Sequence, residues 1–313
     1  MTGRLQLGPF GGGVTARREG AIIRPMPKRQ RTNARSSPRS KPRKAKPALT
    51  ARSADPRLLY EAAVQCPEAE IAFVNRWFRK VRKRPARKVR EDFCASAKVA
   101  CEFVRSHRDN IAVGLDLDAP ILAWAKEHSV DALPEAARSR VTLLRRNVAS
   151  PGKGADKGFD AVLAFNFSYW VFKTRATLLA YFKKVRASLA KDGIFFLDIY
   201  GGYESFTAQE ERRRCKGFTY VWDQVSYDPI SAAYLCRIHF EFRDGTKIRN
   251  AFEYDWRLWT IPEVRELLAE AGFKESVVHW EGDTAKGEGN GVFRPTDKGE
   301  DCASFIAYIT AHK

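Results

Sequence analysis

The chain has 313 residues, of which 44% are hydrophobic, with 20 Phe and 7 Trp, so it can bury a large core in one or two domains. No apolar run approaches the roughly 20 residues needed to span a bilayer, and the first thirty residues lack the apolar core of a secretory signal. The six cysteines are scattered, with no C-x-x-C pair and no histidine at metal-ligand spacing, so we expect a cytoplasmic protein with no bound metal and no membrane association.

The net charge of +18 is concentrated at the start of the chain. Residues 1–56 hold 14 Lys and Arg against two acids, and they are rich in Pro, Ser and Gly. Such a segment has too little apolar surface to offset the entropy of ordering, so we expect a disordered basic tail. It could bind nucleic acid through phosphate contacts. The alternatives are a solvated extension, residues upstream of the true start codon, or an organelle transit peptide.

Folded sequence is expected from about Pro56. Apolar residues at helical spacing predict a helix over 68–83. Nine of the fifteen residues from 76 to 90 are Lys or Arg, with a proline inside the run. This basic run is either a phosphate-binding patch or a solvated helix face.

From residue 87 short apolar strands alternate with amphipathic helices. Strands are predicted at 88–93, 111–116, 140–145, 159–165 and 194–199, with helices at 96–106, 119–128 and 174–190, the last ended by K-D-G at 191–193. This alternation is typical of parallel strands joined by helical crossovers. No internal repeat is visible.

The pattern then changes to antiparallel strands over residues 217–258. Asp244-Gly245 is a strong hairpin signal, and apolar and polar residues alternate on both sides of it. A helix with a capping box follows at 261–272. Strands near 274–280 and 303–311 close the chain.

The most informative motif extends from Val89 to Asp118. It reads V-R-E-D-F-C-A-S-A at the end of one strand and A-V-G-L-D-L-D through the next. Two strands that each end in an acid, joined by a tight turn of small residues and a helix, form the first half of a nucleotide-binding unit. The second acid, about twenty residues after the turn, is suited to bind a ribose. Alanines and a serine occupy the turn where glycines are usual.

With N-F-S-Y at 166–169 and W-R-L-W-T-I-P-E at 256–263, these motifs resemble a class I S-adenosylmethionine-dependent methyltransferase over residues 57–313. More narrowly, the chain is similar to a poorly characterised bacterial group with R-E-D-F-C-G-T in the first turn. The resemblance implies an α/β fold with a three-layer, Rossmann-like methyltransferase sheet. That sheet would have five parallel strands plus a terminal antiparallel pair, with an inserted β-hairpin region at 217–258.

The resemblance also implies the residues that bind S-adenosylmethionine. Glu91 matches the acid that supports the methionine amino group, and Asp116 matches the acid that accepts hydrogen bonds from the ribose hydroxyls. Asn147 stands where the family usually has an acid beside the adenine amine. The cofactor-binding candidates are Glu91, Phe93, Cys94, Ala95, Asp116, Leu117, Asn147, Val148, Asn166 and Phe167.

The main departure from the family is the first turn, where Phe93, Ala95 and Ala97 match three glycine positions. A Cβ there costs little if φ is negative, but more if the turn needs a positive φ. Cofactor binding either survives in a slightly widened turn or has been lost in a non-catalytic relative. Cys94 in the same turn is expected to pack rather than to act as a nucleophile.

The expected reaction is in-line methyl transfer to a small molecule, which needs alignment and desolvation but no enzyme nucleophile. The candidate acceptor-binding residues are Tyr169, Tyr203, Trp256 and Arg257. Arg257 could clamp an acceptor carboxylate, whereas hairpin packing explains the aromatic residues equally well. The alternatives are a nucleic-acid methyltransferase, although N-F-S-Y lacks the two prolines of that motif, and a degenerate binding module. The oligomeric state is left open.

Overall fold

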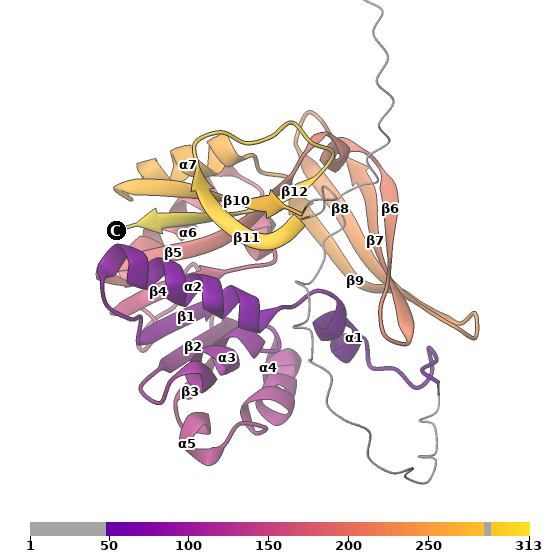
Figure 1. Ribbon diagram of the computed structural model, residues 1–313, viewed down its shortest axis with the longest axis horizontal. Coiled ribbons are helices and arrows are strands. Elements are labelled where there is room, and N and C mark those ends of the chain that lie inside the picture. Colours follow the sequence, from indigo (N-terminus) through magenta and orange to yellow (C-terminus); the bar gives the residue numbers. More distant parts are fainter. Residues whose placement is uncertain (1–47, 285–288) are drawn as a thin grey trace, which may run out of the picture.

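The computed structural model describes residues 48–284 and 289–313, so most of the expected basic tail lies outside the described residues. An eight-stranded sheet covered by helices lies beside a four-stranded antiparallel sheet (Figure 1). The main helices are α1 (Pro56–Ala63), α2 (Pro67–Arg82), α3 (Lys98–Ser106), α4 (Ala119–Ala125), α5 (Glu135–Arg138), α6 (Arg175–Ser188) and α7 (Ile261–Glu270). The large sheet contains β1 (Lys88–Asp92), β2 (Ile111–Asp116), β3 (Val141–Arg145), β4 (Phe159–Ala164), β5 (Leu189–Gly201), β10 (Glu275–Asp283), β11 (Gly289–Thr296) and β12 (Phe305–His312).

The large sheet has the strand order β11-β10-β12-β5-β4-β1-β2-β3. Strands β1 to β5 are parallel, β12 is antiparallel to β5, and β10 is antiparallel to β12. The predicted five parallel strands and terminal antiparallel pair are therefore confirmed. The structure also has an edge strand, β11, which pairs with β10. It was not predicted, because its glycines and proline interrupt the alternation of apolar and polar residues by which strands are recognised.

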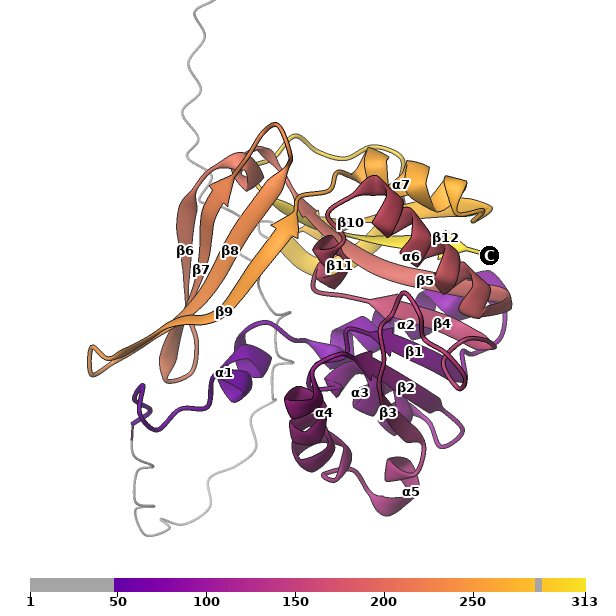
Figure 2. The same cartoon turned by 180° about the vertical axis from the view of Figure 1, so that it is seen from behind.

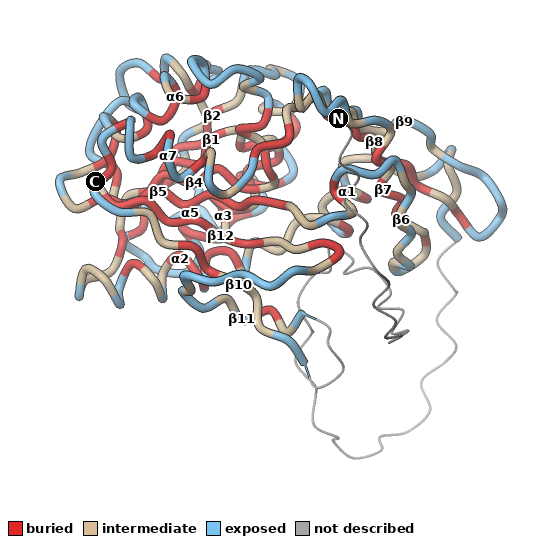
Figure 3. The backbone as a smooth tube through the Cα atoms, turned by 90° about the horizontal axis from the view of Figure 1, so that it is seen from above, coloured by how far each residue is buried: buried red, intermediate tan, exposed pale blue. Residues whose placement is uncertain are grey.

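The sheet is the middle of three layers, as the opposite views in Figures 1 and 2 show. Helices α2 and α3 pack on one face through Phe78 and Phe103, which share a core cluster with Phe196 of β5. Helices α6 and α7 pack on the other face, where the cluster includes Phe182 and Phe195. Adjacent residues of β5 thus face opposite layers, and the inner strands β1, β2, β4 and β5 are buried along most of their length (Figure 3).

Two helix ends differ from the prediction. Helix α4 ends at Ala125 and continues as the π-helical turn η1 (Lys126–Val130). The K-D-G segment belongs to β5, which already starts at Leu189, because the pairing of β4 with β5 shifts between Phe159 and Ala161. A Cβ on Gly193 would lie 2.9 Å from the Phe159 carbonyl oxygen, so glycine permits this irregularity in the ladder.

The antiparallel sheet consists of β6 (Gln209–Arg214), β7 (Phe218–Tyr227), β8 (Ala233–Phe242) and β9 (Lys247–Arg257). Asp244-Gly245 lies in the turn between β8 and β9, as predicted. Strand β6 was not predicted, because its sequence Q-E-E-R-R-R has no apolar face and only edge pairing with β7 orders it. The backbone N–H of Ala51 donates to Thr246 Oγ1 (3.0 Å), so residues assigned to the tail contact this sheet.

This second sheet stands beyond the carboxyl ends of the parallel strands (Figure 1). It contacts the large domain through aromatic residues, with the ring centroids of Phe167 and Trp256 6.4 Å apart. Across residues 48–284 and 289–313, no helix is both long enough and apolar enough to cross a membrane.

Candidate functional site

Acidic side chains gather at the carboxyl ends of the central strands, where open α/β sheets bind ligands. Glu91 lies near the end of β1, Asp116 ends β2, and Asp198 lies in the last third of β5. The structure therefore brings together acids that are more than one hundred residues apart in sequence. The turn after β1 and the N-F-S-Y turn after β4 border the same edge.

The turn after β1 has the backbone of a glycine-rich turn without the glycines. Phe93, Ala95 and Ala97 have φ values of 57°, 41° and 55°, so all three positions matched to glycines are left-handed. For an L-residue this conformation costs about 1–2 kcal/mol. The sequence left open whether φ at these positions is negative or positive. It is positive, so each Cβ in this turn costs conformational energy.

Asp116 holds this turn in place. Its Oδ2 accepts a hydrogen bond from the backbone N–H of Ala95 (2.9 Å), and its Oδ1 accepts one from Asp118 (3.0 Å). A carboxylate offers about four acceptor sites, so one on each oxygen remains for a ligand. The side chain joins the two βα turns that a nucleotide would contact.

Glu91 is buried at the start of α3, where its Oε2 accepts the backbone N–H of Ala100 (2.8 Å). Burial raises the pKa of Glu91 well above its usual range, and the nearby Glu70 and Asp116 carboxylates add to this. Glu70 reaches the same region from α2. Burial raises the pKa of Glu70 to about 8, and its Oε2 has no hydrogen-bond partner in the described part of the chain. These acids lack a cation among the described residues, and a cationic ligand would favour their charged forms.

The N-F-S-Y turn is anchored by Asp198. Its carboxylate accepts the backbone N–H groups of Asn166 (2.7 Å) and Phe167 (2.9 Å), both of which have a positive φ. Burial raises the pKa of Asp198 to about 7, against the lowering effect of these hydrogen bonds. Tyr169 is fully buried and donates its hydroxyl to the Asp198 carbonyl oxygen (3.0 Å), so it supports the turn from within the core.

The remaining cofactor candidates differ in exposure. The Cys94 side chain is buried against Gly114, and burial raises the pKa of its thiol well above the usual range, which disfavours a thiolate nucleophile. Leu117, beside Asp116, is 60% exposed, so its side chain is accessible to a ligand. Asn147 is exposed and uses its Oδ1 to accept the Ala149 N–H, whereas Val148 is buried.

The acceptor candidates are not all in one place. Trp256 lies between the two sheets, in ring contact with Phe167 and Trp170. Tyr203 is 61% exposed. Arg257 donates to Glu263 Oε1 (2.9 Å) beside the α7 capping box and lies over Trp259, whereas its buried Nε has no hydrogen-bond partner among the described residues.

Several residues of this region were missed because pattern alone cannot show them. In the sequence, Glu70 is one of several polar residues of an amphipathic helix, and Asp198 is a single polar residue in an apolar strand. Neither position by itself indicates a binding site. Arg90 and Asp92 belong to the recognised motif, but only the structure shows them as a fully buried ion pair (2.7 Å). Tyr181 donates its hydroxyl to Asp92 (2.8 Å) and joins β1 to α6.

One group of three side chains among the described residues could surround a metal ion, namely Glu210, Asp223 and His239. His239 Nδ1 accepts the backbone N–H of Asn250 (2.8 Å), which places the proton of a neutral imidazole on Nε2, beside Asp223 (3.1 Å). That tautomer offers no free lone pair to a metal. The group is explained as a hydrogen-bonded network of the antiparallel sheet.

No protein-family model and no curated protein matches the sequence. The fold matches an S-adenosylmethionine-dependent methyltransferase from Clostridium acetobutylicum, with 14% identity and a TM-score of 0.58 over 82% of this chain and 96% of the other. An S-adenosylmethionine-bound amino pentose methyltransferase from Micromonospora echinaspora matches with 17% identity and a TM-score of 0.58 over 82% and 96%. A sugar N-methyltransferase from a Streptoalloteichus species matches with 16% identity and a TM-score of 0.53 over 87% and 98%. The chain thus has the Rossmann-like methyltransferase fold.

Proposed function

We propose that this protein is an S-adenosylmethionine-dependent methyltransferase that acts on a small molecule. The observation that carries the proposal is the Asp116 carboxylate at the end of β2, tied to a left-handed β1–α3 turn and with acceptor capacity to spare. We assign residues 57–313 to the catalytic domain, with the antiparallel sheet as an insertion. The similarity of the first turn to the R-E-D-F-C-G-T group supports the same assignment.

The residues at the strand ends fit the cofactor. Asp116 has one unused acceptor site on each oxygen for ribose hydroxyls. The β1–α3 turn has the left-handed backbone conformation of a glycine-rich turn, which a nucleotide-like ligand can approach closely. Glu91 and Glu70 would provide negative charge when a cationic ligand, carrying an ammonium and a sulfonium group, lowers their raised pKa values. The backbone of Asn147 and Val148, beyond β3, would border the adenine.

Binding and alignment are the tasks of this chain. When bound, the cofactor supplies a sulfonium methyl group, an electrophile that an acceptor lone pair displaces in line. Asp198 fixes the backbone of Asn166 and Phe167 at the end of β4, and the side-chain amide of Asn166 makes no hydrogen bond among the described residues. That amide is therefore free to orient an acceptor. The fixed turn provides the alignment on which in-line transfer depends.

The acceptor is proposed to enter beside Phe167, where the packed aromatic rings of the two sheets meet and would have to separate to admit it. Trp170, Trp222 and Trp256 surround this place, with ring centroids 5.7 Å (Trp170–Trp256) and 6.3 Å (Trp222–Trp256) apart. The indole N–H groups of Trp170 and Trp222 are both buried without a hydrogen-bond partner among the described residues, a costly arrangement that an oxygen atom of an acceptor would relieve. Aromatic walls with only these two neutral donors favour a small organic acceptor over a polyanion.

Calorimetric titration of S-adenosylmethionine into wild type, Asp116→Ala and Asp109→Ala tests the cofactor assignment. Asp109 is an exposed acid before β2, so its removal is a matched change in charge away from the site. We expect micromolar-range binding by wild type and Asp109→Ala, and at least about tenfold weaker binding by Asp116→Ala, because charge-assisted hydrogen bonds are lost. A wild type that binds neither the cofactor nor its demethylated product would contradict the proposed function. Equal affinity in all three proteins would contradict only the ribose assignment.

A further inference from the structure

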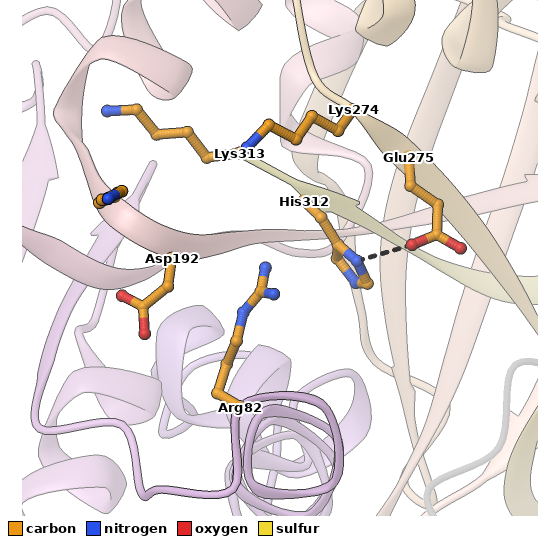
Figure 4. Close-up of a pocket in the computed structure, with 7 residues that line it drawn as sticks. Arg82, Asp192, Lys274, Glu275, His312 and Lys313 are labelled. Carbon is orange, nitrogen blue, oxygen red and sulfur yellow. Dashed lines mark ion pairs between the residues drawn. The ribbon is translucent and has the colours of Figure 1, made fainter.

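A basic pocket lies at the opposite end of the sheet from the acidic edge. Its volume is about 580 Å³, and it is formed where α2 ends, where β5 and β10 begin, and where β12 ends. Figure 4 shows side chains from all of these elements arranged around one space. The lining residues are Arg82, Lys191, Asp192, Lys274, Glu275, His312 and Lys313.

The charges in this pocket do not balance. Its two acids are already paired, Asp192 with Arg84 through two hydrogen bonds (2.9 and 2.8 Å) and Glu275 with His312 Nδ1 (3.0 Å). Lys313 donates to the Leu189 carbonyl oxygen. The ammonium groups of Lys191 and Lys274 have no acidic partner within 4 Å among the described residues, so the pocket keeps an excess of positive charge.

Arg82 is the central unsatisfied group. Among the described residues, its buried Nε and Nη2 atoms have no hydrogen-bond partner. His312 Nε2 is also buried, with no hydrogen-bond partner within residues 48–284 and 289–313. Leaving charged donors buried and unpaired is costly, and an oxyanion that accepts from the planar guanidinium fork would remove that cost.

We propose that this pocket binds a phosphate group. Arg82 would supply paired N–H donors, and Lys191 and Lys274 would supply the additional charge that a dianion needs. The basic run that the sequence showed between residues 76 and 90 leads to this pocket, because Arg82 is the last residue of α2. The phosphate belongs either to a small phosphorylated molecule or to a nucleic acid that also contacts Arg76, Arg79 and Lys80, which line a neighbouring hollow of α2.

Calorimetric titration of the full chain with inorganic phosphate, at low ionic strength, tests the site. Arg82→Ala and Lys274→Gln should each weaken binding at least about tenfold, and Arg82→Lys should recover part of the affinity because it keeps the charge but not the fork. Lys184→Ala removes an exposed charge of α6 outside the pocket and should leave binding unchanged. The basic tail is present in every variant, so differences between them report the pocket.

Three results would overturn the proposal: no phosphate binding by wild type, equal binding by Arg82→Ala and wild type, or an equal loss in Lys184→Ala. Thermal melts accompany each variant, and Lys274→Gln provides the test if Arg82→Ala does not fold. A second titration with a fluorescent oligonucleotide identifies the source of the phosphate. For a nucleic acid, Arg79→Ala should weaken oligonucleotide binding several-fold but leave inorganic phosphate unaffected. For a small phosphorylated ligand, Arg79→Ala should change neither.

Discussion

The left-handed turn after β1 leads to a quantitative prediction about glycine. Ala95 has a φ of 41° and is half-buried, so its Cβ contributes strain but little packing. Relief of about 1–2 kcal/mol of strain is offset by about 0.4–1 kcal/mol of extra entropy in the unfolded chain. Ala95→Gly should therefore raise the free energy of unfolding by roughly 0.5–1 kcal/mol.

Ala97 provides the internal comparison. Its φ is 55°, but its methyl group is completely buried, and losing it costs about 0.8 kcal/mol of burial. Ala97→Gly should therefore be nearly neutral. Ala100→Gly, inside α3, should destabilise by about 2 kcal/mol, because glycine is a poor helix residue (about 1 kcal/mol) and a completely buried methyl group is lost (about 0.8 kcal/mol).

Urea unfolding monitored by tryptophan fluorescence measures all three variants, with unchanged slopes required for the comparison. The order of stability should be Ala95→Gly above wild type and Ala97→Gly, with Ala100→Gly lowest. If Ala95→Gly lost as much stability as Ala100→Gly, the turn would not be left-handed at that position and the reasoning would be refuted.

Three further predictions concern buried charges. Wild type should lose stability in urea melts as pH rises from 4.5 to about 8, because folded Glu70 keeps a proton that the unfolded chain releases. Glu70→Gln should make this loss smaller, and an unchanged dependence of stability on pH would contradict the prediction. Arg90→Met should cost about 3–5 kcal/mol by leaving Asp92 buried and unpaired, and a loss below about 1 kcal/mol would be incompatible with the pair. Arg257→Ala should cost only about 0.2–1 kcal/mol through its half-exposed contact with Glu263, and turnover should be unchanged; a raised acceptor Michaelis constant would instead support the clamp.

The sequence predicted the architecture well because the parallel strands and crossover helices have clear periodicities. It located β1, β2 and β4 to within a residue or two, since apolar runs bounded by acids and turns mark where such strands end. It missed β6 and β11, because edge strands are ordered by pairing with a neighbour and need no apolar pattern of their own.

The site was predicted only as far as local motifs extend. The resemblance proposed Asp116 and Glu91 as site residues because they lie at or near the ends of two strands, whereas Glu70 and Asp198 approach the same region from α2 and β5 only through tertiary folding. The sign of φ at Ala95 could not be known either, since alanine rarely adopts the left-handed region and only the hydrogen bond to Asp116 shows what holds it there. Arg257 was read from its spacing among aromatic residues, and its pairing with Glu263 depends on how α7 begins.

A crystal structure of the wild-type protein grown with S-adenosylhomocysteine tests the central claim most directly. The proposed function predicts the ribose hydroxyls within hydrogen-bond distance of the Asp116 carboxylate, the amino group of the ligand towards Glu91, and the sulfur atom facing Phe167. A ligand bound at another place, or no ligand density at the carboxyl ends of β1 and β2 at saturating concentration, would contradict the proposed function.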